Sequence, residues 1–243
     1  MTPNNIFDNM HILVLVIIFG MIVRFFLQAY QAYREERLKE IDEKELNNYI
    51  VDPIAIKYLV DGEIGRNQLY SSIFAGVITK VIFLERDVTE KLIFRLDKTN
   101  RLINSRTYDS VEGFDEDITP IDAFILKEIV FRDSNSLTLK EIISIPDPSE
   151  EAIDAIKTLL INELYQRGIL EGEDVRYTNE GARIRSDVSH YVKSDMIHFT
   201  DLEVALDEEN ALAKIYLAIN FGTYKLSKLD FQYLYEILYN PKK

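Results

Sequence analysis

The chain has 243 residues, with 28 Lys and Arg against 41 Asp and Glu, a formal net charge of −13, and no Cys or Trp. A hydrophobic content of 47% with only nine Gly and six Pro excludes collagen-like, low-complexity and wholly disordered chains. The absence of Cys excludes disulfides and Cys-ligated metals, and the acidic balance argues against nucleic-acid binding, which depends on clustered Lys and Arg.

An apolar segment near the N-terminus predicts a transmembrane helix. Residues 12–23 are all apolar, and residues 10–30 reach about 32 Å as a helix, which matches one hydrocarbon core. The alternatives are a signal peptide and a buried core helix. A signal peptide needs basic residues before the segment and a small-residue cleavage site, but Asp8 is the only charged residue there and no such site follows. We therefore expect a short outer tail at residues 1–9 and one membrane span at residues 10–30.

The charges beside this segment predict its orientation. No Lys or Arg precedes the span, whereas several follow its apolar core: Arg24, Arg34, Arg37, Lys39 and Lys44. The positive-inside rule then places the N-terminus outside and the C-terminal part in the cytoplasm, as a single-pass protein of the inner or plasma membrane. Arg24 can extend towards the polar layer, and Tyr30 and Tyr33 lie where interfacial aromatic residues are expected. We assign these three residues to the membrane boundary.

Residues 31–49 predict a charged helical stalk. The stretch has no Gly or Pro, and Glu35 with Lys39 and Glu40 with Lys44 have the favourable i,i+4 orientation. Its apolar stripe is too thin to predict a coiled coil.

Two winged-helix-like units are predicted to follow, at residues 50–114 and 115–200. Asp52-Pro53 and Thr119-Pro120 each combine an N-cap residue with proline at the first helical position. In the first unit, apolar residues recur every fourth position from Leu69 to Val81 and predict a helix. Residues 91–97 and 101–106 flank the turn-like residues 97–100 and predict a hairpin.

The second unit carries more start and stop signals. Thr138 and Glu141 form a capping-box pattern, Ser149 is placed to cap a helix over residues 150–167, and Gly168 is placed to end it. Two short strands around Gly172 then predict a second hairpin. Three helices followed by a hairpin are the order of a winged helix, so the predicted fold class is mainly α, of the α+β type.

Residues 201–243 predict an aromatic-rich helical region. An apolar helix at residues 210–221 ends at Gly222, and many aromatic and aliphatic residues crowd the positions that follow. This surface either packs back on the second unit or binds a partner. The candidate partner-binding residues are Tyr224, Phe231, Tyr235 and Tyr239. Lys225, Lys228, Asp230 and Gln232 leave this region a polar face.

The residues from Leu159 to Ile184, LLINELYQRGILEGEDVRYTNEGARI, resemble the last helix and wing of bacterial and archaeal winged-helix domains. A Gly after the helix and a Tyr-x-Thr-x-x-Gly-like strand end carry the resemblance. Here the strand end reads Tyr177-Thr178-Asn179-Glu180-Gly181, without the spacer residue before Thr. The whole layout is similar to a group of prokaryotic membrane proteins of unknown function with one span, a polar stalk and tandem winged-helix-like cytoplasmic units. The resemblance implies an architecture and no catalytic motif.

Winged helices commonly bind DNA, but the charges here do not favour that function. The predicted third helix of the second unit presents Glu150, Glu151 and Asp154, and residues 118–200 contain nine basic against fifteen acidic residues. A duplex-binding face would be basic, so we do not expect nucleic acid as a partner.

The sequence contains few candidates for catalytic or metal-binding residues. His190 and His198 lie near Asp187, Asp195 and Asp201, but their spacing matches no common metal motif. The acidic run at residues 112–117 lacks the alternating ligands of a calcium loop, and we interpret it as a linker. Nucleophile-elbow, phosphate-loop and dinucleotide motifs are absent. We expect no catalytic, cofactor-binding or metal-binding residues and no cofactor.

These observations predict a non-enzymatic interaction subunit or scaffold. The bilayer would hold it, and its cytoplasmic part would bind protein partners in a membrane-associated assembly. One alternative is a membrane-tethered winged-helix DNA-binding regulator. Another is an enzyme that uses carboxylates from Asp187, Asp195 or Asp201.

Overall fold

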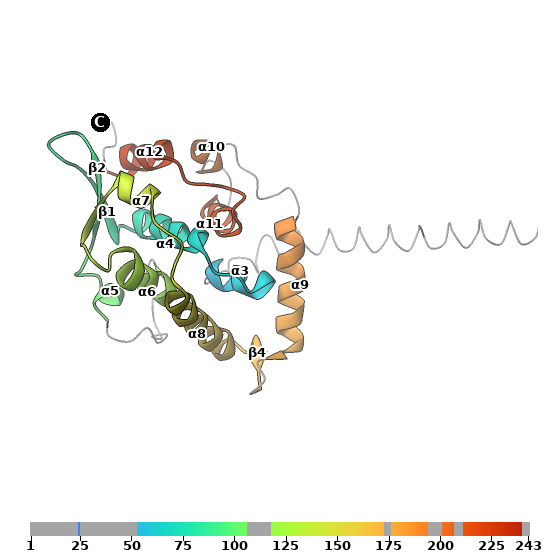
Figure 1. The fold of residues 1–243 in the computed structure, drawn as a ribbon. Helices are drawn as coiled ribbons and strands as arrows, with labels where there is room; N and C mark the ends of the chain where they lie inside the picture. Colours follow the sequence, from blue (N-terminus) through green and yellow to red (C-terminus); the bar gives the residue numbers. More distant parts are fainter. Residues whose placement is uncertain are drawn as a thin grey trace, which may run out of the picture. The chain divides into compact units, whose positions relative to one another are not determined.

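The computed structural model describes Arg24 and residues 53–105, 118–172, 176–193, 201–206 and 211–239. All of these except Arg24 belong to one compact unit, Ile50–Lys243. This unit is mostly helical with small antiparallel sheets, which confirms the predicted α+β class (Figure 1). Within the described residues no helix is both long and apolar enough to cross a membrane. The predicted span at residues 10–30 lies outside them, apart from Arg24, which is helical and exposed.

The described part of this unit contains helices and short strands. In chain order they are α3 (Pro53–Asp61), α4 (Arg66–Ile78), β1 (Ile82–Arg86), β2 (Leu92–Leu96), α5 (Arg101–Asn104), α6 (Pro120–Phe124), the π-helical η2 (Ile125–Val130), β3 (Ser136–Thr138), α7 (Leu139–Ile143), α8 (Glu150–Gln166), β4 (Leu170–Glu171), β5 (Arg176–Tyr177), α9 (Asn179–Lys193), α10 (Leu202–Leu206), α11 (Ala211–Phe221) and α12 (Lys228–Leu238).

Helix α4 runs through the core of the unit. Its buried side chains include Leu69, Ile73 and Phe74, and α11, η2, α6 and β1 all pack against it. Gly76 lets β1 and η2 pack closely against α4. A Cβ atom at this position would lie 2.8 Å from the Ile82 side chain of β1 and 3.0 Å from the Leu126 side chain of η2.

Polar contacts inside the core fix the position of α11 on α4. The Gln68 side-chain amide donates to the Asn220 backbone carbonyl at 3.0 Å, and the Asn220 amide donates to the Ser71 hydroxyl at 2.6 Å. All three residues are buried. Because a buried polar group is costly unless it is hydrogen-bonded, these pairs favour one register between the two helices.

The larger sheet has the order β1-β2-β3 and is antiparallel throughout. Ile82 lies opposite Leu96, and Phe94 lies opposite Leu137. Side chains alternate along β1 and β2, with Ile82 and Phe94 buried and Phe83 exposed. Strand β3 follows η2, so residues on both sides of the predicted boundary between residues 114 and 115 share one sheet.

The hairpin predicted from residues 91–97 and 101–106 is wrong. Strand β2 pairs instead with β1, and Arg101–Asn104 forms α5. The Asn100 side chain explains the difference, because it accepts hydrogen bonds from the backbone N–H groups of Leu102 and Ile103 and so starts a helix.

Helix starts predicted from local signals are confirmed. Thr119 caps α6, Thr138 and Glu141 form the capping box of α7, and Ser149 caps α8. Gly168 and Gly222 end their helices with positive φ angles of 67° and 73°. Each of these signals acts within one helical turn, which is why the sequence reveals it.

Candidate docking groove

Two of the aromatic residues proposed to bind a partner lie inside the unit. The Phe231 side chain is 0% exposed and contacts the Phe94 ring edge-to-face at 5.0 Å. Tyr224 is also buried, and its hydroxyl donates to the Asp230 carboxylate at 2.7 Å. Burial and the Asp230 contact both raise the pKa of Tyr224. Neither side chain can reach a partner while the chain keeps this fold.

The other two aromatic candidates, Tyr235 and Tyr239, are half-buried and lie over β1. The Tyr239 hydroxyl donates to the Ile82 carbonyl at 2.9 Å, and burial raises its pKa to about 12. The Tyr235 and Tyr239 rings are stacked, with their centres 6.4 Å apart. Tyr239 thus occupies one backbone acceptor on the free edge of β1, and this hinders pairing of that edge with another strand.

Most of the other candidate positions fall outside the described residues. These comprise Tyr30 and Tyr33 at the predicted membrane boundary, the linker at residues 112–117, and Asp195 and His198. Asp187 and His190 lie in α9, but their side chains are not described, and Asp201 is exposed. Within the described ranges no three His, Cys, Asp or Glu side chains gather as metal ligands.

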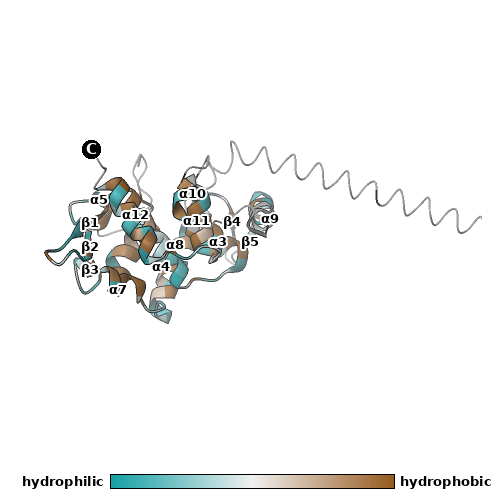
Figure 2. Cartoon of the chain, turned by 90° about the horizontal axis from the view of Figure 1, so that it is seen from above, coloured by the Kyte–Doolittle hydropathy of each residue, from teal (hydrophilic) through white to brown (hydrophobic). Residues whose placement is uncertain are grey.

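A groove of about 710 Å³ lies where three distant segments meet: the β1–β2 turn, the start and body of α7, and the first turns of α12. Both views of the fold place these elements at the same end of the unit, far from α9 (Figures 1 and 2). Its lining consists of Arg86, Glu90, Lys91, Leu92, Thr138, Leu139, Lys140, Ile143, Ser144, Lys228 and Gln232. The volume falls in the range of about 300–1,000 Å³ that is usual for ligand pockets.

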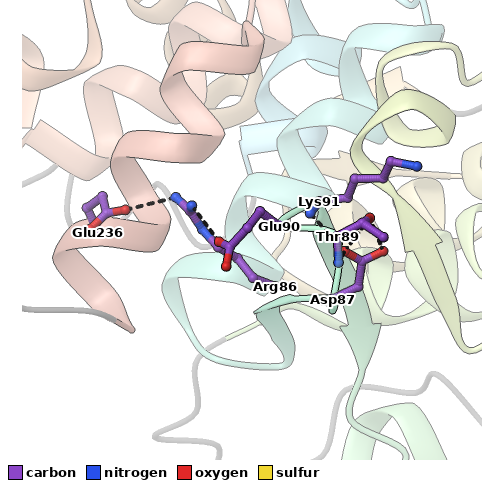
Figure 3. Close-up of polar contacts among 6 residues, drawn as sticks. All are labelled: Arg86, Asp87, Thr89, Glu90, Lys91 and Glu236. Carbon is purple, nitrogen blue, oxygen red and sulfur yellow. Dashed lines mark hydrogen bonds and ion pairs between the residues drawn. The ribbon is translucent and has the colours of Figure 1, made fainter.

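Asp87 holds the turn that forms one wall of this groove (Figure 3). Its carboxylate accepts the backbone N–H of Thr89 at 2.7 Å and that of Lys91 at 2.9 Å. The hydrogen bonds from Lys91 and Thr89 lower the pKa of Asp87. Glu90 has a φ angle of 59°, in the left-handed region that favours glycine, and this conformation is retained within a hydrogen-bonded turn.

Arg86 joins this wall to α12. Its guanidinium contacts the carboxylates of Glu90 at 3.2 Å and Glu236 at 3.0 Å (Figure 3). It also lies 4.9 Å from the centre of the Tyr235 ring. The Glu236 ion pair and the Tyr235 cation–π contact link the hairpin to α12, whereas the Glu90 ion pair lies within the hairpin.

The opposite wall is α7, which a hydrogen bond from α4 supports. The Tyr70 hydroxyl donates to the Ile143 carbonyl at 2.7 Å. The Ile143 side chain is 41% exposed, and Leu139 is half-buried. The hydroxyls of Thr138 and Ser144 donate to Glu141 and to the Lys140 carbonyl, so local contacts occupy both groups. The groove therefore offers apolar surface between cationic side chains.

The groove has a charge opposite to that of the whole chain. Four cationic side chains and one carboxylate line it, whereas the chain has a formal net charge of −13. Chemically, this arrangement can hold an anionic group and an apolar group together.

The sequence did not reveal this groove. Lys140 and Glu141 stood out only as a capping pattern, and Lys228 and Gln232 only as part of a polar face. No local pattern indicates that these residues meet Lys91, because the three segments are far apart in the chain. The relevant signal would have been the unusual placement of Lys228 in the first turn of α12.

The long helix α8 presents a different surface. Glu150, Glu151 and Asp154 are exposed at its N-terminal half, as the sequence predicted. Carboxylates at this position repel phosphates. Comparison of the chain with models of known protein families, with curated proteins and with solved structures finds no significant match.

Proposed function

We propose that this chain is a membrane-anchored, non-enzymatic interaction subunit that binds protein partners of a membrane-associated assembly through the groove. The observation that carries the proposal is the basic, partly apolar groove on an otherwise acidic chain. The anchor is the apolar segment at residues 10–30, and the basic residues after it favour a cytoplasmic location for the groove.

The order of elements from α6 to β5 supports an interaction module of the winged-helix type. Helix α6 with η2, strand β3, helices α7 and α8, and the β4–β5 hairpin follow one another as in a winged helix. One difference is that β3 pairs with β2 of the preceding hairpin instead of with β4 or β5. The exposed carboxylates of α8 favour protein over DNA as the partner.

Charge reversal in the groove tests this function. The full-length protein would be purified in mild detergent as wild type, as Lys140→Glu/Lys228→Glu in the groove, and as Lys80→Glu/Lys98→Glu. Lys80 and Lys98 are exposed and flank the base of the hairpin, so the second double variant has the same charge change away from the groove. Mass spectrometry would identify and quantify the co-purifying proteins.

We expect one defined set of proteins to bind the wild type and the Lys80/Lys98 variant and to be lost from the Lys140/Lys228 variant. The same set bound to all three proteins would contradict groove-dependent recognition. If no protein binds and duplex DNA is retained with a steep salt dependence, the tethered regulator replaces this proposal.

A further inference from the structure

Three lysines in the groove form no direct ion pair with any residue that the structure describes. Within the described ranges, the ammonium groups of Lys91, Lys140 and Lys228 make no hydrogen bond or ion pair. The carboxylates on the same elements make other direct contacts: Asp87 with the hairpin turn, Glu141 with Thr138, and Glu90 and Glu236 with Arg86. Among the described residues, the three ammonium groups are therefore open to direct contact with a ligand.

One of these lysines occupies a position that helix stability does not favour. Lys228 lies in the first turn of α12, where the helix macrodipole favours acidic residues, whereas Lys140 belongs to the last turn of the five-residue α7 as well as to its first. The capping boxes of both helices use acids at the third position, Glu141 and Asp230, in agreement with this preference. A residue type that conflicts with its local structure often marks a functional site.

Apolar side chains accompany these charges. Ile143 lines the groove and is 41% exposed, and Leu139, which also lines it, is half-buried. A purely ionic ligand would leave both partly in water, whereas a ligand that also carries apolar groups would cover them.

We infer that the groove binds an acidic peptide segment of a partner protein that also carries apolar side chains. This inference rests on the proposed function and specifies the chemistry of its partner. The carboxylates of the segment would contact Lys91, Lys140 and Lys228, and its apolar side chains would cover Leu139 and Ile143. The concave shape and apolar lining favour a peptide over a flat anionic membrane surface.

A peptide-binding experiment tests this chemistry directly. The probe is a fluorescent synthetic peptide of alternating Glu and Leu. One control peptide replaces each Leu by Ser, and a second replaces each Glu by Lys. Fluorescence anisotropy would measure their binding to the full-length protein in a neutral detergent, with empty micelles as the blank. We expect the Glu-Leu peptide to bind, both control peptides to bind much more weakly, and added salt to reduce the affinity.

The same double variants locate the binding. Lys140→Glu/Lys228→Glu should weaken binding about tenfold or more, and Lys80→Glu/Lys98→Glu should leave it nearly unchanged. Glutamate suits the first turn of a helix, so the groove variant is expected to fold. Circular dichroism would verify that it does.

Three results would overturn the inference. The two double variants could lose affinity equally, the Ser peptide could bind as tightly as the Leu peptide, or vesicles of anionic lipid could bind through Lys140 and Lys228 while the peptide does not. If groove-dependent capture of proteins persists while the acidic peptide fails to bind, only this inference is wrong and the proposed function stands.

Discussion

Asp122 is a buried carboxyl that hydroxyl and backbone donors hold at the start of α6. The Ser72 hydroxyl donates to it at 2.7 Å and the Thr119 hydroxyl at 2.9 Å. Burial nevertheless outweighs these hydrogen bonds and raises the pKa of Asp122. Burial also raises the pKa of Glu163, in spite of its ion pair with Arg167, and the charge of Asp122 adds to the increase. Both carboxyls therefore bind a proton more tightly in the folded state than in the unfolded chain.

This difference predicts the pH dependence of the Asp122→Asn variant. A raised pKa gives stability that is fully present below the unfolded value of 3.8 and is lost as pH rises through the folded value. Each unit of the increase corresponds to about 1.4 kcal/mol. Asparagine cannot ionise, so the variant should gain stability relative to wild type as pH rises from about 4 to 8. Urea unfolding of the full-length protein at several pH values would measure this, and parallel profiles for the two proteins would contradict it.

At the scale of elements, Gly181 lets the first turn of α9 lie against the backbone of Ile169, the residue before β4. A Cβ at this buried position would lie 2.1 Å from the Ile169 carbonyl oxygen, and a backbone atom cannot easily move away. That oxygen accepts the Thr178 backbone N–H at 3.1 Å, and the Thr178 hydroxyl accepts the Gly181 N–H at 3.0 Å. The turn therefore leaves no space for a Cβ atom at position 181.

Gly181→Ala should destabilise the protein by about 2–3 kcal/mol, as overpacking commonly does. In an unobstructed helix the same change would stabilise by about 1 kcal/mol, so the sign of the effect distinguishes the two cases. Urea unfolding followed by the helical circular dichroism signal would measure it. Equal or higher stability would show that the close approach to Ile169 is not essential.

The starts of helices could be predicted from the sequence, whereas the pairing of strands could not. Caps such as Thr138 and Ser149 act within one turn of their helices, and the predicted starts of α7 and α8 are correct for that reason. The pairing of β2 with β3 joins residues such as Phe94 and Leu137, and no local pattern indicates it. The groove depends on the same kind of distant contact, and its lining includes none of the aromatic candidates.

At the scale of the whole molecule, the proposed function requires the groove to face the cytoplasm. The chain has no Cys, so one introduced thiol reports the location of its own position. Thr2→Cys lies in the predicted outer tail. Val88→Cys lies at the tip of the β1–β2 turn, where the native side chain is fully exposed. Substitution there should change stability by less than about 0.5 kcal/mol.

In spheroplasts of a bacterial expression host, a membrane-impermeant maleimide should label Thr2→Cys directly and Val88→Cys only after the membrane is permeabilised. This result follows from the positive-inside rule, because every Lys and Arg near the predicted span lies within or after it. Labelling of Val88→Cys in sealed spheroplasts would place the groove outside and remove its access to cytoplasmic partners. Protection of both thiols until permeabilisation would show that residues 10–30 do not span the membrane, and the groove would then act without this anchor.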